Sequence, residues 1–223
     1  VWVYNKDFKL LWGASCNTGH YSYAYDIDKD GKDELLIGYT LFDDDGSKIW
    51  EIPGLKDHAD GIVISPIGLD GKIKIVIAGG DDGIMIVDTD GNILARDEIG
   101  HAQTPSVAKF FPELHGLQIC TITFWRYPGA ICMYDSKGRR LSVFEIYPLG
   151  SPIIPTNWIG NGQEFILFSG DVKYGGLFNG LGRKVLSLPD DGHPILCCDA
   201  LNLTGDERDE IVVWDTKGMY IYT

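Results

Sequence analysis

The stretch DIDKDGKDE, Asp26 to Glu34, carries an oxygen-bearing side chain at nearly every second position and a glycine in its centre. It precedes the apolar run Leu35–Ile37 and follows Tyr21–Tyr25, in which tyrosine alternates with small residues. Alternation and short apolar runs are typical of β-strands. The stretch therefore predicts an acidic corner between two strands, rather than an EF-hand, which needs a helix on each side.

The spacing of this corner suits a hard cation such as Ca²⁺, because carboxylate and carbonyl oxygens are the ligands that calcium prefers. The alternative is an acidic, solvated turn that binds no metal. The predicted ligands are the side chains or carbonyls of Asp26, Asp28, Asp30, Lys32 (carbonyl) and Glu34.

Composition indicates an all-β protein. The chain has 223 residues, of which 28 are glycine, and many short apolar runs separated by Gly/Asp/Asn turns. One domain spanning residues 1–223 is expected, because all-β domains often reach this length. The formal net charge of −13 argues against nucleic acid or an anionic membrane surface as a partner. No apolar run is long enough for a transmembrane helix.

The five cysteines show no metal-binding spacing, and buried free thiols are the simpler interpretation. The chain begins without a methionine or a signal peptide, as expected for a mature or excised piece. Compartment and oligomeric state are therefore left open by the residues.

Internal repetition indicates the architecture. His20, His58, His101 and His193 each open an apolar stretch, and units of about 35 to 50 residues follow with four expected strands each. Hairpin signals recur at matching places in these units: Asp43–Gly46, Asp88–Gly91, Asp135–Gly138 and Asn179–Gly182. Four strands per unit predicts a β-propeller of about five blades.

The chain is expected to start and end on equivalent third strands, Val1–Tyr4 and Met219–Tyr222. Such a cut leaves a strand to spare in a closed ring of five. Part of a larger propeller is therefore favoured over a closed small one.

A second copy of the corner precedes Ile211, with only two carboxylates, so weaker metal binding or a hydrogen-bonded corner without metal is expected. Its predicted ligand positions are Asn202, Thr204, Asp206, Arg208 (carbonyl) and Glu210. The corners of the other units have lost these residues.

In a propeller the recurrent histidines fall where the innermost strands line a central funnel, so they are candidates for acid–base chemistry. A buried imidazole that holds an interblade turn is the alternative for each of them. Asp60 and Gln103 lie close to two of the histidines in sequence and are candidate substrate contacts. Trp125, Arg126 and Tyr127 form an aromatic strand end with a guanidinium, suited to a sugar face and a carboxylate, although core packing also explains such aromatics.

The Asp-x-Asp-x-Asp-Gly-x-x-Glu corner after an aromatic strand resembles the calcium-binding repeats of propeller polysaccharide lyases, the rhamnogalacturonan lyases of family eleven, and related FG-GAP-like repeats. The segment Asn202–Trp214 resembles the closing segment of such proteins. The degenerate middle corners depart from that calcium-rich pattern. The resemblance implies Ca²⁺, an acidic polysaccharide as partner, and an extracellular or periplasmic location, whereas the unpaired cysteines leave a cytoplasmic one open.

It further implies β-elimination on a polysaccharide containing rhamnose and uronic acid. In that case His20, His58 and His101 are base or donor candidates, and His193 is a fourth wall of the funnel. Tyr21 or Tyr23 would be the acid, and Arg126 a clamp for the carboxylate. The alternative is a non-catalytic, calcium-stapled FG-GAP-like propeller that binds carbohydrate or protein. A glycoside hydrolase is less favoured, since most carboxylates fall at corners and hairpins.

Overall fold

The computed structural model describes residues 1–125, 129–146 and 153–223. Within them it contains strands and turns, and no helix long and apolar enough to cross a membrane. The strands form antiparallel sheets of neighbours in sequence, as predicted for propeller blades.

The sheets follow the chain in order. The first, two-stranded sheet pairs β1 (Trp2–Tyr4) with β2 (Leu10–Gly13). Four four-stranded sheets follow: β3 (Ser22–Tyr25), β4 (Glu34–Ile37), β5 (Thr40–Phe42) and β6 (Lys48–Glu51); β7 (Gly61–Ser65), β8 (Lys74–Ala78), β9 (Ile84–Val87) and β10 (Ile93–Asp97); β11 (His101–Ala108), β12 (Gln118–Phe124), β13 (Ala130–Tyr134) and β14 (Arg140–Glu145); and β15 (Ile154–Thr156), β16 (Phe165–Ser169), β17 (Gly176–Phe178) and β18 (Lys184–Leu186). The last sheet has three strands, β19 (Cys197–Leu201), β20 (Glu210–Trp214) and β21 (Met219–Tyr222).

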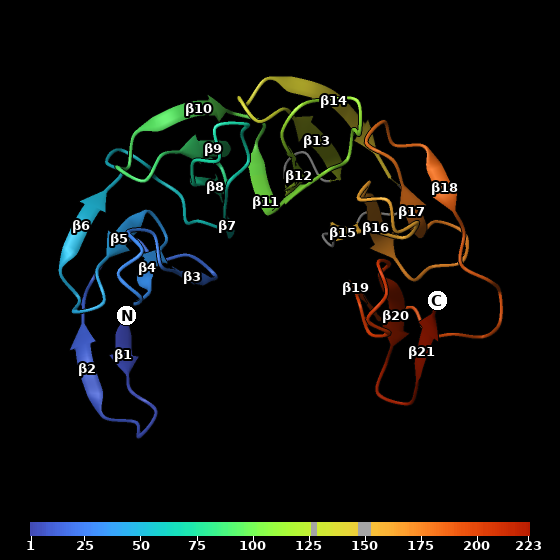
Figure 1. Ribbon diagram of the computed structural model, residues 1–223, viewed down its shortest axis with the longest axis horizontal. Coiled ribbons are helices and arrows are strands. Elements are labelled where there is room, and N and C mark those ends of the chain that lie inside the picture. Colours follow the sequence, from blue (N-terminus) through green and yellow to red (C-terminus); the bar gives the residue numbers. More distant parts are fainter. Residues whose placement is uncertain (126–128, 147–152) are drawn as a thin grey trace.

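The blades follow one another around an open arc rather than a closed ring of five (Figure 1). The first strands of the blades, β3, β7, β11, β15 and β19, lie on the inner side of the arc, and the fourth strands lie on its outer side. The predicted phase is confirmed, since β1 and β2 occupy the places of a third and a fourth strand and β21 that of a third. The residues that open the blades therefore face the concave side.

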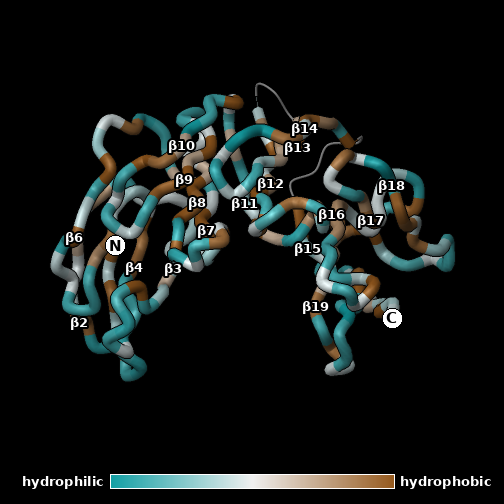
Figure 2. The backbone as a smooth tube through the Cα atoms, turned by 45° about the horizontal axis from the view of Figure 1, so that its top comes forward, coloured by the Kyte–Doolittle hydropathy of each residue, from teal (hydrophilic) through white to brown (hydrophobic). Residues whose placement is uncertain are grey.

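Apolar side chains lie between neighbouring blades, where the tube in Figure 2 is brown along the middle strands. Leu36 of the first complete blade packs in one buried cluster with Ile62 and Ile77 of the second. Equivalent clusters join the second blade to the third, the third to the fourth and the fourth to the last. The middle strands read as nearly continuous apolar runs because both of their faces are covered.

The predicted hairpin turns also connect the blades. In each of the four, the glycine N–H donates to the carbonyl of the first turn residue and φ is positive, which favours glycine. A Cβ on Gly46 would lie 2.6 Å from Trp12 of the preceding blade, and one on Gly91 would lie 2.8 Å from Trp50. The two indoles donate to the carbonyls of Asp44 and Thr89, at 3.1 and 2.8 Å. Aromatic rings thus fasten each turn to its neighbour.

Candidate functional site

Two backbone contacts bring the openings of adjacent blades together. Gly19 forms an isolated bridge with Ala59, and the His20 N–H donates to the Ala59 carbonyl at 3.0 Å. A Cβ on Gly19 would lie 2.0 Å from that carbonyl oxygen, so only glycine fits this approach. Gly80 makes the equivalent bridge to Ala102, the residue after His101. The glycine bridges therefore place histidines from successive blades side by side.

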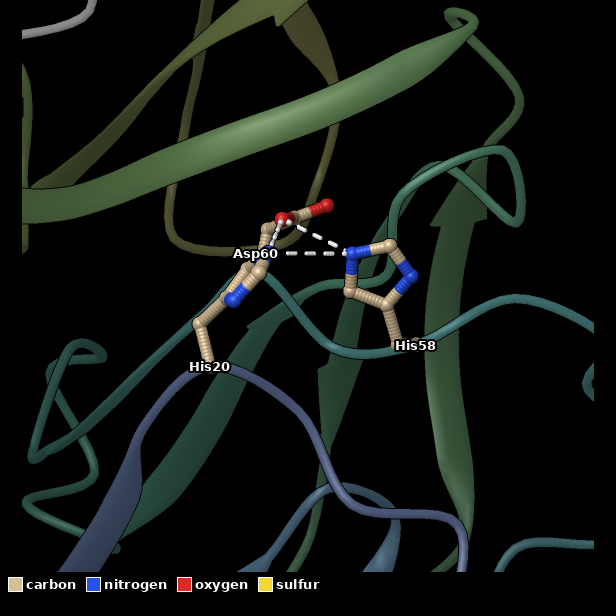
Figure 3. A group of neighbouring side chains, drawn as sticks. All are labelled: His20, His58 and Asp60. Carbon is tan, nitrogen blue, oxygen red and sulfur yellow. Dashed lines mark hydrogen bonds and ion pairs between the residues drawn. The ribbon is translucent and has the colours of Figure 1, made fainter.

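His20 and His58 converge on one carboxylate oxygen (Figure 3). Asp60 Oδ1 lies 3.1 Å from His20 Nε2 and 3.3 Å from His58 Nε2, and the two nitrogens lie 3.2 Å apart. The side chain of Asp60 is only 2% exposed, whereas those of His20 and His58 are 60% and 40% exposed. The carboxylate is thus a buried anchor beneath two imidazoles that solvent can reach.

His101 holds the second oxygen of the same carboxylate. Its Nε2 lies 3.0 Å from Asp60 Oδ2, and its Nδ1 lies 3.0 Å from Asp81 Oδ1 and 3.2 Å from Asp57 Oδ2. Asp57 also accepts from His58 Nδ1, at 2.6 Å. We call these six residues the histidine centre: His20, Asp57, His58, Asp60, Asp81 and His101.

The electrostatics of the centre are dominated by burial. Burial raises the pKa of Asp60 above its ordinary value, and the three neighbouring imidazoles offset only part of this effect. Burial also acts on Asp57, but hydrogen bonds from the Asp81 N–H and from His58 outweigh it and lower the pKa of Asp57. Three carboxylates and three imidazoles therefore share the site.

An aromatic residue borders the centre. The indole of Trp125 is 68% exposed and meets the His101 ring edge-on, with centroids 6.5 Å apart. Its φ of 58° is unusual for a large side chain and marks a strained backbone beside the cluster. Gln103 Nε2 lies 3.5 Å from Asp60 Oδ1. Arg126 and Tyr127 lie outside the described residues.

Tyr21 and Tyr23 face different surroundings. Tyr21 is 70% exposed beside His20, whereas Tyr23 packs against the apolar cluster between the first two complete blades. Tyr21 is thus the more accessible of the two predicted acids.

His193 does not join the centre. It is buried between the fourth and last blades, where Nδ1 pairs with Asp191 at 2.8 Å and Nε2 donates to the Gly170 carbonyl at 2.6 Å. Burial lowers the pKa of His193, but these two hydrogen bonds outweigh it and leave the pKa raised. The ring also packs against Tyr222. These contacts are those of an imidazole that holds a turn.

The Asp26–Glu34 corner connects β3 to β4 as predicted, and its chemistry suits a cation. Oxygens of Asp26, Asp28 and Glu34 lie within 4.8 Å of one another. Glu34 is buried and accepts from the Ile27 N–H at 2.6 Å. Asp26 Oδ1 is buried without a hydrogen-bond partner, as expected of an oxygen that faces a cation.

The second corner is closed by its own hydrogen bonds. Glu210 accepts from the Leu203 N–H at 2.6 Å and from the Thr204 hydroxyl at 3.0 Å. The Arg208 guanidinium lies 3.0 Å from Asp206 Oδ2, and the amide of Asn202 donates to the Asp206 carbonyl. Of the two alternatives, the hydrogen-bonded corner fits these contacts better.

Sequence reasoning missed Asp57 and Asp81, which lie in loops outside the repeat pattern. Asp57 immediately precedes His58, and Asp81 lies in the β8–β9 turn, GGDDG, at residues 79–83. A signal was present, because a carboxylate next to a candidate histidine commonly orients its ring. Asp60, expected to contact substrate, instead anchors the histidines from below.

Comparison with known proteins identifies the fold. No protein family and no curated protein sequence matches the chain. Among solved structures, the exotype rhamnogalacturonan lyase YesX is 20% identical, with a TM-score of 0.74 over 100% of this chain and 41% of that one. A Bacillus licheniformis rhamnogalacturonan lyase of family PL11 is 22% identical, with a TM-score of 0.65 over 96% of this chain and 38% of that one.

BBS1N, solved in complex with ARL6DN, is 13% identical with a TM-score of 0.65 over 99% of this chain and 74% of that one. The chain spans about two fifths of the length of the lyases it resembles. At these identities the likeness concerns the fold alone. The chain has the blade architecture of the propeller-like polysaccharide lyases.

Proposed function

We propose that the chain carries the catalytic centre of a lyase that cleaves a uronic-acid-containing polysaccharide, such as rhamnogalacturonan, by β-elimination. The observation that carries the proposal is the convergence of His20, His58 and His101, from three successive blades, on the buried Asp60. The shared fold with rhamnogalacturonan lyases supports it.

β-Elimination places three demands on a site. Positive charge must neutralise the uronate carboxylate so that the C5 proton becomes acidic, a base must remove that proton, and an acid must protonate the leaving oxygen. Asp57, Asp60 and Asp81 make the centre anionic unless imidazolium or a bound cation balances them. An anionic sugar therefore requires such a cation here.

Exposure divides the roles. His20 and His58 are accessible and would contact the substrate, whereas His101, whose side chain is 8% exposed, is a positioning residue that holds Asp60. Tyr21 is exposed directly beside His20 and is the proposed proton-transfer group. The exposed face of Trp125 would receive a sugar ring.

The test is release of unsaturated uronate, followed by its absorbance, from rhamnogalacturonan, ulvan and gum arabic. His20→Ala and His58→Ala are expected to abolish release, because each removes a group at the substrate face. His115→Ala is the matched control, since that histidine is exposed in a turn away from the centre. Undiminished release by both centre variants would contradict the proposal.

The fold also supports a second candidate, a non-catalytic binding propeller, because BBS1N shares it and was solved in complex with ARL6DN. This candidate predicts that oligosaccharide or protein binds without any unsaturated product. The same assay, combined with a binding measurement, separates the two.

A further inference from the structure

We propose that His20 Nε2, His58 Nε2 and Asp60 Oδ1 bind one divalent first-row transition-metal ion, such as Zn²⁺, Mn²⁺ or Co²⁺. The inference deepens the proposed function, since it identifies the cation at the same site. It does not depend on lyase activity, because it follows from the ligand atoms alone.

The spacing of the three atoms is that of ligands around a small metal ion. Their separations are 3.1, 3.2 and 3.3 Å, a nearly equilateral triangle. An ion held at about 2.1 Å from nitrogen and oxygen ligands separates neighbouring ligand atoms by roughly 3.0–3.4 Å. One ion just above the triangle would therefore reach all three atoms.

The surrounding carboxylates prepare the nitrogens as ligands. Asp57 Oδ1, at 2.6 Å, assigns the proton of His58 to Nδ1, so the neutral ring presents a lone pair at Nε2. Asp81 and Asp57 assign the proton of His101 to Nδ1 in the same way. A carboxylate that accepts from the second nitrogen of a metal-binding histidine is a recurrent feature of such sites.

This arrangement leaves an imbalance that a cation would remove. His101 Nε2 and Asp60 Oδ2 lie 3.0 Å apart, yet neither has a hydrogen-bond partner, and both are buried. With the assigned tautomers, two imidazole lone pairs face the Asp60 carboxylate. Such an arrangement is unfavourable at low dielectric unless positive charge lies among these atoms.

The ligand types select the class of metal. Two imidazoles and one carboxylate favour transition metals, whereas calcium prefers sites made of oxygen alone, such as the Asp26–Glu34 corner. The exposure of His20 and His58 leaves further coordination positions open to solvent or to a substrate carboxylate.

The test uses Co²⁺ as the probe, added to chelator-treated protein and followed by its visible absorption and by calorimetry. One equivalent is expected to bind saturably, with the absorption bands of a nitrogen-ligated ion. His20→Gln and His58→Gln should each reduce the affinity at least tenfold, while His115→Gln should leave it unchanged. Asp57→Asn should weaken binding about 10–100-fold, as loss of an outer-shell partner does.

Absence of Co²⁺ binding, or binding that His20→Gln and His58→Gln leave unchanged, would overturn the inference and assign the positive charge to protonated imidazoles. Circular dichroism of each variant verifies that the fold is retained, and Zn²⁺ competition against the wild type gives a readout that needs no variant. Co²⁺ binding without unsaturated product would sustain the metal site and contradict the lyase. Product formation without Co²⁺ binding would do the reverse.

Discussion

Gly19 makes the closest contact between the first two complete blades, so its substitution tests how the histidine centre is assembled. In Gly19→Ala the new Cβ would lie 2.0 Å from the Ala59 carbonyl oxygen, and the two strands must separate by about 1 Å to relieve the clash. His20 moves with Gly19, which would lengthen its 3.1 Å contact with Asp60 beyond hydrogen-bonding distance. Overpacking of this kind costs about 1–3 kcal/mol.

For a domain of this size, Tm falls by about 2–4 °C per kcal/mol, so thermal unfolding detects the change easily. Gly218→Ala is the matched control, because its new Cβ would meet only the edge of Tyr220, at 4.0 Å. We expect Gly19→Ala to lose both stability and Co²⁺ affinity, and Gly218→Ala to keep both. Equal Tm and equal Co²⁺ affinity in the two variants would refute the argument that the glycine bridge positions His20.

Three further predictions concern other parts of the chain. Because the folded state raises the pKa of His193, the stability that wild type gains over His193→Gln should be full below about pH 6.5 and decline as pH rises through the folded-state pKa, as unfolding across pH 5–8 will show. Glu34→Gln should abolish any Ca²⁺-induced rise in Tm, whereas Glu210→Gln should destabilise without changing the Ca²⁺ response; equal responses would contradict the difference between the corners. Trp125→Ala should weaken oligosaccharide binding by roughly 0.5–1.5 kcal/mol in calorimetry, and unchanged affinity would remove Trp125 from the sugar site.

The fold could be predicted from the sequence because a propeller repeats its local signals. Each hairpin turn needs a glycine with positive φ, and Gly46, Gly91, Gly138 and Gly182 recur at matching places. The corner Asp26–Glu34 has the same origin, since a short loop must satisfy its own backbone donors. The curvature of the arc has no such local signal, because it results from side chains packed between blades.

The candidate site was predictable only in part. The register of His20, His58 and His101 indicated that the three would share the concave side. Their meeting on Asp60 depends on two glycine bridges between blades, which no repeat period reveals. His193 shares the same preceding glycine, yet its ring turns into the core to meet Asp191 and Gly170. A position within a repeat therefore predicts the strand on which a residue lies better than the direction of its side chain.

The central claim is that cation and uronate meet at the histidine centre. The most direct measurement is the visible absorption spectrum of the Co²⁺-loaded protein during titration with an oligosaccharide that contains galacturonate. The account predicts a saturable change in the cobalt bands, because the uronate carboxylate enters a coordination position beside His20 and His58, and no change with a neutral oligosaccharide of the same length. An unchanged spectrum at saturating galacturonate oligosaccharide would contradict it.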